Sequence, residues 1–265
     1  MRDGSAIAAA LGGRRTSRGW EFPCPCHETH HNSAIIFDSG VLYCHAKCDP
    51  RDIAAALDER DLRDDGKTVK VDYEKIARDD AAAIARARWM WENALHGDEH
   101  TPYVAYYLRS RGITRPVPPV LRRKYGSAFL AAVQQLDGSI VAVQDKYPRD
   151  RPDIKGRNTG RMRRGAVQLA PPVNGELGLT EGVEDALSVI QMFGVPTWAV
   201  IGTRLDAIAL PPGLRKIHLF PDNNGKPGRE AAERALVHYL QIVDVEIWWP
   251  DEGCDWNDRL CRGKK

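Results

Sequence analysis

The sequence predicts a mixed α/β protein in which a small N-terminal module and an α+β middle precede a Rossmann-like parallel sheet with flanking helices. Three observations support this prediction. Closely spaced Cys and His residues near the N-terminus predict a small module that binds a metal ion. Predicted strands in the middle form a hairpin, whereas strands and helices alternate over the last ninety residues. Alternation of this kind is typical of a doubly wound parallel sheet.

Two pairs of candidate metal ligands flank a predicted hairpin near the N-terminus. Cys24 and His27 are two residues apart in a CPCH segment, and Cys44 and Cys48 have three residues between them. Residues 33–37 and 41–43 have strand-like sequences, joined by a turn. Because tetrahedral Zn²⁺ takes four thiolate or imidazole ligands, the sequence predicts a zinc ribbon held by these four side chains.

The cysteines also allow other interpretations. Cys26 and His45 are close enough in sequence to replace a neighbouring ligand, and Cys44 or His45 can serve as the third ligand. Buried thiols or, in a secreted protein, disulfides are the alternatives to zinc. We see no signal peptide and no apolar run approaching the ~20 residues of a membrane span. We therefore expect a cytoplasmic protein without a membrane partner.

Local patterns predict the elements that follow. Asp49 can cap a helix that begins at Pro50 and continues through residues 53–57. A charged segment at 60–68 predicts a linker. Further helices are predicted at 73–96 and 102–111, and strands at 129–133, 140–143 and 166–169, of which the first two are joined by an Asp-Gly turn.

The C-terminal part has the alternating pattern. Strands are predicted at 177–180, 197–201, 216–220 and 245–249, and helices at 183–193 and 228–240. In such a sheet the functional site lies at the carboxyl ends of the strands.

Charge is unevenly distributed, although the formal net charge is only +2. Residues 103–124 contain basic side chains and no acidic ones, and residues 146–164 are again strongly basic. A basic middle between acidic flanks predicts a track for nucleic-acid phosphates, the alternative being an ordinary solvated surface. The candidate phosphate-binding residues are Lys146, Lys155, Arg157, Arg161, Arg163 and Arg164.

Acidic residues follow three of the predicted strands. Glu181 comes directly after the first, Asp222 begins a DNNG loop after the third, and Asp255 and Asp258 follow the last. Carboxylates at neighbouring strand ends can converge on Mg²⁺ or Mn²⁺, which prefer oxygen ligands. The alternative is that Glu181 and Asp222 cap the helices that follow them.

These segments resemble a known family. The Glu181-Gly182 pair and the DNNG loop at 222–225 resemble the two signature motifs of the Toprim domain, which bacterial-type primases, topoisomerases and some nucleases share. The CPCH segment followed by Cys44 resembles the zinc ribbon of bacterial and phage primases. The segments YLRSRGI at 107–113, GAVQL at 165–169 and DWND at 255–258 resemble parts of phage and plasmid Toprim primases.

The resemblance implies an arrangement of domains and a set of site residues. It implies a zinc-ribbon domain at 1–62, a helical linker at 63–100, the N-terminal part of a primase core at 101–172 and a Toprim domain at 173–265. Glu181 and Asp222 would be the catalytic acids. The family has a second acid two residues after Asp222, where this chain has Asn224. The implied Mg²⁺ or Mn²⁺ ligands are Glu181, Asp222, Asn224, Asp255 and Asp258.

The resemblance implies a DNA primase of phage, plasmid or integrated-element type. Such an enzyme joins ribonucleoside triphosphates into a short RNA primer on a single-stranded DNA template. No Gly-x4-Gly-Lys-Ser/Thr loop is present, so we expect any replicative helicase to be a separate partner. The alternative functions are a Toprim-type metal-dependent nuclease and a non-catalytic DNA-binding replication or regulatory protein.

Overall fold

The computed structural model describes residues 3–29, 31–60, 62, 73–148 and 156–263. The chain divides into two compact units, Met1–Lys75 and Ile76–Lys265, each of which is considered by itself. Residues 61 and 63–68 of the charged segment predicted as a linker lie outside the described residues, as does Lys155.

The N-terminal unit is an antiparallel sheet with two helices. Its strands β1 (Arg14–Thr16), β2 (Gly19–Phe22), β3 (Ala34–Phe37) and β4 (Leu42–Cys44) pair in sequence order. The predicted hairpin is confirmed as β3 and β4, whereas β1, β2 and helix α1 (Gly4–Leu11) extend the fold beyond the prediction. Helix α2 (Pro50–Asp58) begins as predicted, because the Asp49 side chain accepts a hydrogen bond from the Arg51 backbone.

A second antiparallel sheet forms the middle of the chain. Strands β5 (Leu121–Arg122), β6 (Phe129–Gln134), β7 (Ile140–Lys146) and β8 (Arg157–Gly160) pair in that order. Helix α3 (Tyr73–Glu92) packs Ala87 and Trp91 against one face of this sheet, and helix α4 (Thr101–Ser110) packs against the other face. Alternate residues of β6 contribute to the two cores, as the pleat of a strand requires.

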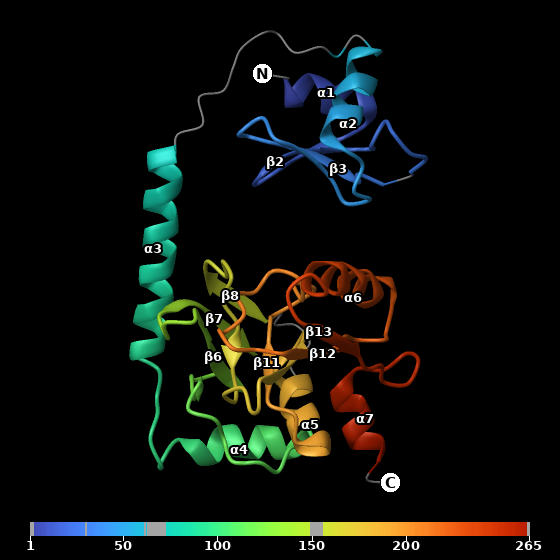
Figure 1. Ribbon diagram of the computed structural model, residues 1–265. Coiled ribbons are helices and arrows are strands. Elements are labelled where there is room, and N and C mark those ends of the chain that lie inside the picture. The colour runs from blue at the N-terminus through green and yellow to red at the C-terminus, as the bar shows by residue number, and fades with distance from the viewer. Residues whose placement is uncertain (1–2, 30, 61, 63–72, 149–155, 264–265) are drawn as a thin grey trace. The chain divides into compact units, whose positions relative to one another are not determined.

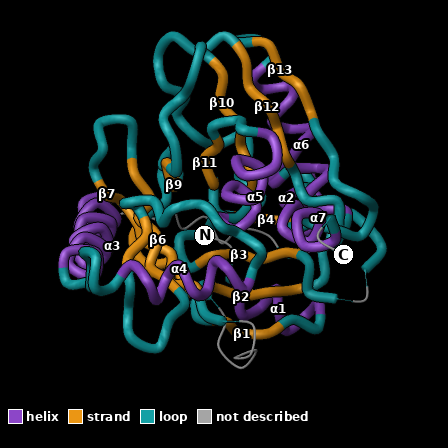
Figure 2. Tube along the Cα trace, turned by 90° about the horizontal axis from the view of Figure 1, so that it is seen from below, coloured by secondary structure: helices purple, strands orange, loops and turns teal. Residues whose placement is uncertain are grey.

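The C-terminal part contains the predicted parallel sheet. Its strand order is β13-β12-β10-β11-β9, and the strands are β10 (Glu176–Thr180), β11 (Thr197–Ala199), β12 (Lys216–Phe220), β13 (Asp244–Ile247) and β9 (Val167–Gln168). They run side by side in Figure 2. All pairings are parallel except the one between β9 and β11.

Helices cover both faces of this sheet. Helix α6 (Lys226–Tyr239) covers one face, while α5 (Val183–Phe193) and α7 (Trp256–Arg262) lie together on the other (Figure 1). One hydrophobic core joins α4 and β6 to α5 and β11, so the middle and the C-terminal part fold as one unit. None of the helices among the described residues combines the length and apolar character needed to cross a bilayer.

Candidate functional site

The four predicted zinc ligands lie together in the N-terminal unit. One ligand atom from each of Cys24, His27, Cys44 and Cys48 lies within 4.8 Å of all the others. Cys44 ends β4, and the loop that follows it brings Cys48 back to the same point. No other group of three or more Cys, His, Asp or Glu side chains in the described part of the chain is gathered so closely.

The surroundings of the tetrad suit a structural metal ion. Nδ1 of His27 lies 3.2 Å from the Cys48 sulfur, and its Nε2 lies 3.3 Å from the Ser33 hydroxyl, which can fix the orientation of the ring. Burial raises the pKa of the Cys24 thiol to about 12. A metal that binds thiolates would remove that proton. Three thiols and one imidazole fit tetrahedral Zn²⁺.

The alternative ligands lie outside the tetrad. Cys26 is exposed, and His45 is exposed with its ring edge-on to Tyr43 at a centroid distance of 5.2 Å. The structure therefore places Cys44 rather than His45 among the four.

An acidic cluster lies at the carboxyl ends of the neighbouring parallel strands β10 and β12. Glu181 follows β10, and its Oε1 accepts a 3.4 Å hydrogen bond from the backbone N–H of Asp222, which follows β12. Gly228 of α6 allows this approach, because a Cβ atom there would lie 2.3 Å from the Asp222 carbonyl oxygen and 3.2 Å from Glu181 Oε1.

Loop hydrogen bonds bring α7 to the same place. The Trp256 indole donates to the Pro221 carbonyl at 3.1 Å, and the Asn223 backbone N–H donates to the Cys254 carbonyl at 3.0 Å. These bonds hold the start of α7 against the end of β12. Asp255 and Asp258 thereby come close enough to raise the pKa of Asp222.

The electrostatics of the cluster are those of crowded, partly buried carboxylates. Burial, then Glu181, Asp255 and Asp258, raise the pKa of Asp222 to about 7. Burial also raises the pKa of Glu181, an effect that the hydrogen bond from Asp222 partly offsets. Oδ1 of Asp222 is buried and has no hydrogen-bond partner among the described residues, so it is available to ligate a cation. An all-oxygen donor set fits Mg²⁺ or Mn²⁺.

The capping alternative does not fit the geometry of Glu181 or Asp222. The residues that cap α5 and α6 are Gly182 and Gly225, neither helix has a side-chain cap, and both acids remain outside the cap positions. Asp255 does cap α7, because its side chain accepts a hydrogen bond from the Asp258 backbone at 2.6 Å.

Asp185 belongs to the cluster although the sequence analysis did not select it. It lies in the first turn of α5 and is 8% exposed. Burial, then Asp222 and Asp255, raise its pKa well above the usual range. Its place in the first turn of the helix that begins just after Glu181 was an available signal, because the strand end and the start of the next helix lie close together.

Asn224 lies in the DNNG loop, two residues after Asp222. It is exposed in the loop before α6 and lines a cavity of about 420 Å³ with Lys226 and Arg229, whose walls include neither Glu181 nor Asp222. The structure thus brings Glu181, Asp222, Asp255 and Asp258 together, and Asn224 lines this cavity.

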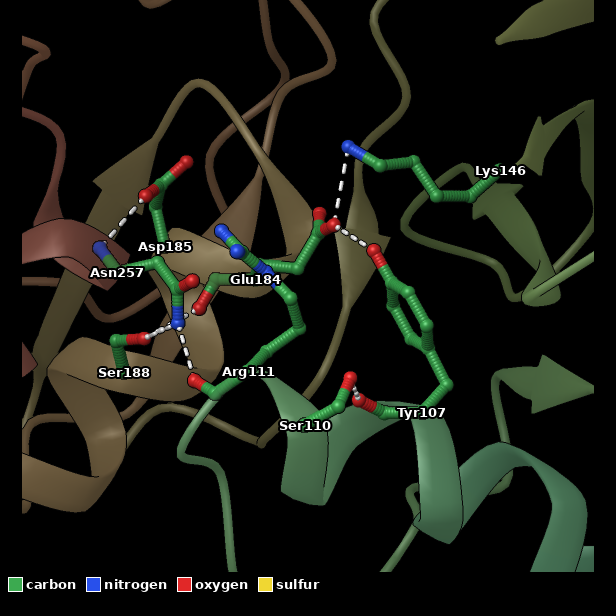
Figure 3. A network of polar contacts seen from close by, with 8 residues as sticks. All are labelled: Tyr107, Ser110, Arg111, Lys146, Glu184, Asp185, Ser188 and Asn257. Carbon is green, nitrogen blue, oxygen red and sulfur yellow. Dashed lines mark hydrogen bonds and ion pairs between the residues drawn. The ribbon is translucent and has the colours of Figure 1, made fainter. Parts of the chain in front are cut away.

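A buried polar network connects the cluster to α4 (Figure 3). The Asn257 backbone N–H donates to Asp185 at 3.0 Å, and its side-chain amide donates to the Arg111 carbonyl at 2.8 Å and to the Ser188 hydroxyl at 2.9 Å. Glu184 accepts a hydrogen bond from the Tyr107 hydroxyl at 2.9 Å. The end of α4 is therefore tied to the helix that carries Asp185.

The predicted phosphate-binding residues have varied surroundings. Lys146 forms an ion pair with Glu184 at 3.0 Å, and Arg161 forms one with Asp80 at 2.5 Å. Arg164 donates to the Ile208 carbonyl at 3.5 Å. Arg157 on β8 and Arg163 in the turn beyond it are exposed. The five described residues of this set lie on β7, on β8 or in the turn beyond β8, and two of their charges already have acidic partners.

Comparisons with known proteins give one family match and several structural likenesses. Residues 176–265 match the Toprim domain family. No curated protein sequence matches the chain. The zinc-binding and RNA polymerase domains of the Aquifex aeolicus primase are 16% identical, with a TM-score of 0.45, over 97% of this chain and 79% of that one.

Two further solved structures are similar at the same level. A DNA primase domain from Pseudomonas aeruginosa is 16% identical, with a TM-score of 0.46, over 68% of this chain and 74% of that one. The primase fragment of the bacteriophage T7 primase-helicase protein is 15% identical, with a TM-score of 0.44, over 92% of this chain and 94% of that one.

The family match covers the four parallel strands, the helices that flank them and every member of the acidic cluster, whereas β9 precedes the matched residues. The strand ends that carry Glu181 and Asp222 are the positions that the sequence resemblance implied for the signature acids. The C-terminal part of the chain, residues 176–265, is a Toprim domain.

Proposed function

We propose that the protein is a DNA primase that makes short RNA primers on single-stranded DNA by metal-dependent nucleotidyl transfer. The observation that carries this proposal is the gathering of Glu181, Asp185, Asp222 and Asp255 at the strand ends of the Toprim domain. The Cys/His tetrad supports it, because a primase needs a means of engaging a single strand as well as a site for chemistry.

The acidic cluster has the charge and donor atoms for a divalent cation. The cation would be held by Asp185, Asp222, Asp255 and Asp258. Oδ1 of Asp222, which accepts no hydrogen bond from the described residues, would be one of the ligand atoms. When bound, Mg²⁺ or Mn²⁺ would neutralise the triphosphate and the departing pyrophosphate. Glu181, whose pKa burial raises, is suited to accept the proton of the attacking hydroxyl.

The remaining parts have supporting roles in the proposal. The tetrad would bind one structural Zn²⁺ and stabilise the N-terminal unit, which would engage the template. The exposed Arg157 and Arg163 would contact phosphates of the template or the nucleotide, together with Lys155.

A priming assay tests the reaction. The protein is incubated with single-stranded DNA, labelled ribonucleoside triphosphates and Mg²⁺ or Mn²⁺, and products are separated by length. We expect short oligoribonucleotides that Glu181→Gln and Asp222→Asn variants fail to make. Asp251→Asn, which changes an exposed acid just before α7, should keep the activity and is the matched control.

The same assay distinguishes the alternative functions. Shortening of the DNA that depends on Asp222 would indicate a nuclease instead. Binding of DNA with neither synthesis nor cleavage would indicate a non-catalytic protein. This outcome is included because the chain has Asn224 where the family has an acid.

A separate replicative helicase is the proposed partner. A pull-down with the helicase encoded by the same genome or element tests this part, and the absence of association under conditions that support priming would count against it.

A further inference from the structure

Exposed tyrosines line a cavity beside α4. The cavity measures about 560 Å³, and its walls include Tyr103 and Tyr106 of α4 and Tyr125 of the loop between β5 and β6. All three side chains are largely exposed, Tyr106 and Tyr125 by 77% and 74%. Exposed aromatic rings around a cavity of this size are typical of a binding site for a planar ligand rather than of a core.

Arg123 stacks between two of the rings. Its guanidinium carbon lies 3.4 Å from the ring centroid of Tyr103 and 4.9 Å from that of Tyr125. Two 2.9 Å backbone hydrogen bonds between Arg123 and Leu95 hold the segment in place. Arg123 therefore places a positive charge against both tyrosine rings.

A second cavity adjoins the first. It measures about 290 Å³, shares Arg123, Lys124 and Tyr125 with its neighbour, and ends at Trp89 of α3, which is 63% exposed. We call the side chains of Trp89, Tyr103, Tyr106, Arg123 and Tyr125 the aromatic strip. The strip offers two adjacent aromatic-walled cavities separated by one stacked arginine.

The charge of the strip suits an anion. No acidic residue is among the described residues that line either cavity. Lys124 pairs with the buried Asp145 beneath the surface, so that lysine's charge is balanced. Arg123 has only the two tyrosine rings against its guanidinium among its described contacts, and the buried Nε of Arg111, in the wall of the first cavity, has no hydrogen-bond partner.

The strip is also connected to the acidic cluster. Tyr107, on the same helix as Tyr103 and Tyr106, donates its hydroxyl hydrogen bond to Glu184, the neighbour of Asp185 (Figure 3). Any ligand on the strip would thus contact α4, a helix that is hydrogen-bonded to the neighbour of Asp185.

We propose that the aromatic strip binds single-stranded nucleic acid by stacking consecutive bases in its two cavities while Arg111 and Arg123 face the phosphates. Every base has a flat face, so the binding is independent of sequence. A duplex hides those faces and binds poorly. Identification of the bound strand as the template rests on the proposed primase function; the binding itself does not.

A binding titration tests the strip. The whole protein is titrated into a fluorescent oligothymidylate, and the dissociation constant is measured by anisotropy at fixed salt. We expect Tyr125→Ala and Trp89→Ala each to weaken binding about tenfold, within the range for loss of one stacked base. Tyr125→Phe and Trp89→Phe keep a ring and should stay within about twofold of the wild type. Circular dichroism checks that each variant is folded.

Matched controls separate stacking from general surface effects. Trp249→Ala removes an exposed aromatic ring from the segment after β13 and should leave the affinity unchanged. A duplex of the same length should compete weakly. If the Tyr125→Ala and Trp89→Ala variants bind like the wild type, or if duplex competes equally, the strip is not a base-stacking site.

Photo-crosslinking locates the contact directly. An oligonucleotide carrying 5-iododeoxyuridine forms covalent links to stacked aromatic side chains, and peptide mapping should find them at Tyr103, Tyr125 or Trp89. Links found only elsewhere in the chain would overturn the proposal. A wild type that crosslinks at the strip but makes no primer would contradict the primase function alone. If Tyr125→Ala primes as well as the wild type at limiting template, the role of the strip in binding the strand is contradicted, but the primase function is not.

Discussion

Asp222 and Asp185 are carboxylic acids in surroundings that favour their protonated forms. Burial contributes most to this effect, and the neighbouring carboxylates add to it. A cluster with so much unfavourable charge stabilises the fold less than an apolar cluster would. The cost is typical of sites where function rather than stability selects the residues.

The raised pKa of Asp222 predicts a dependence of stability on pH. The pKa rises from 3.8 in the reference state to about 7 in the folded chain, so the fold binds this proton more tightly than the unfolded chain does. The contribution to stability is full below about pH 4 and is lost as the pH rises towards about 7. Without added Mg²⁺, the melting temperature of Asp222→Asn should therefore exceed that of the wild type by an amount that grows over this range.

Thermal unfolding at a series of pH values measures this difference. Asp251→Asn, in the exposed loop before α7, is the control and should show no such trend. A difference between Asp222→Asn and the wild type that stays constant from pH 4 to pH 8 would contradict the assignment. Addition of Mg²⁺ at pH 8 should stabilise the wild type more than the variant, because only the wild type retains the ligand.

Some members of the acidic cluster could be predicted from the sequence and others could not, for physical reasons. Glu181 and Asp222 were predictable because they directly follow strands whose ends must meet. Asp185 was missed because an acid in the first turn of a helix is usually exposed, where it stabilises the helix by interacting with the helix dipole. The ion pairs of Lys146 and Arg161 join residues 38 and 81 positions apart, and no local pattern signals such contacts.

Helix α7 is short, yet it is bonded to both α4 and α5. Asn257, 1% exposed, donates its side-chain hydrogen bonds to the end of α4 and to Ser188 of α5. The same residue's backbone holds Asp185. Docking of α7 therefore sets the positions of Asp255, Asp258 and Asp185 at once.

Asn257→Ala should lower the free energy of unfolding by roughly 2 to 4 kcal/mol, because two hydrogen bonds disappear and their acceptors stay buried. Urea denaturation measures the loss. Asn93→Ala removes an exposed asparagine whose side chain bonds only to Trp89 within the described residues, and it should cost less than about 0.5 kcal/mol. Equal losses in the two variants would show that Asn257 has no special connecting role.

The elements that the sequence predicted well have strong local signals. The hairpin at β6 and β7 carries an Asp-Gly turn in which the Asp137 side chain accepts from the Ser139 backbone and Gly138 has a φ of +80°. Strands β1 and β2 contain Gly19, charged residues and few apolar ones, so their pairing depends on β3 rather than on their own pattern. Helix α7 follows an acid-rich loop, and the packing of its Trp256 edge-on against Phe193 and Phe220 is a tertiary effect.

Because the chain divides into two compact units, we expect each unit to fold and unfold independently of the other. The N-terminal unit is small, and its core includes Cys24 and Cys44 beside Phe22, Ile53 and Leu57. Structural zinc supplies about 10 kcal/mol or more of folding free energy in small domains. The larger unit has its own cores and none of the four ligands.

Cys44→Ala should therefore lose bound zinc and the fold of residues 1–75, while residues 76–265 stay folded. Metal analysis of the purified protein should fall from about one zinc per chain to almost none. Limited proteolysis should leave a resistant fragment that begins near residue 76. Cys26→Ala, which removes an exposed thiol outside the tetrad, should keep both the metal and the N-terminal unit. Retention of zinc by Cys44→Ala would contradict the assignment.

The antiparallel strand β9 has a consequence for how the protein can be divided. Val167 and Gln168 precede the residues that match the Toprim family, yet they pair with β11 and close that side of its sheet. A fragment cut at residue 173 would leave the β11 backbone groups unpaired, and an uncovered sheet edge promotes self-association between copies. A soluble fragment with an intact five-stranded sheet must therefore begin before β9, and the boundary near residue 76 meets that requirement.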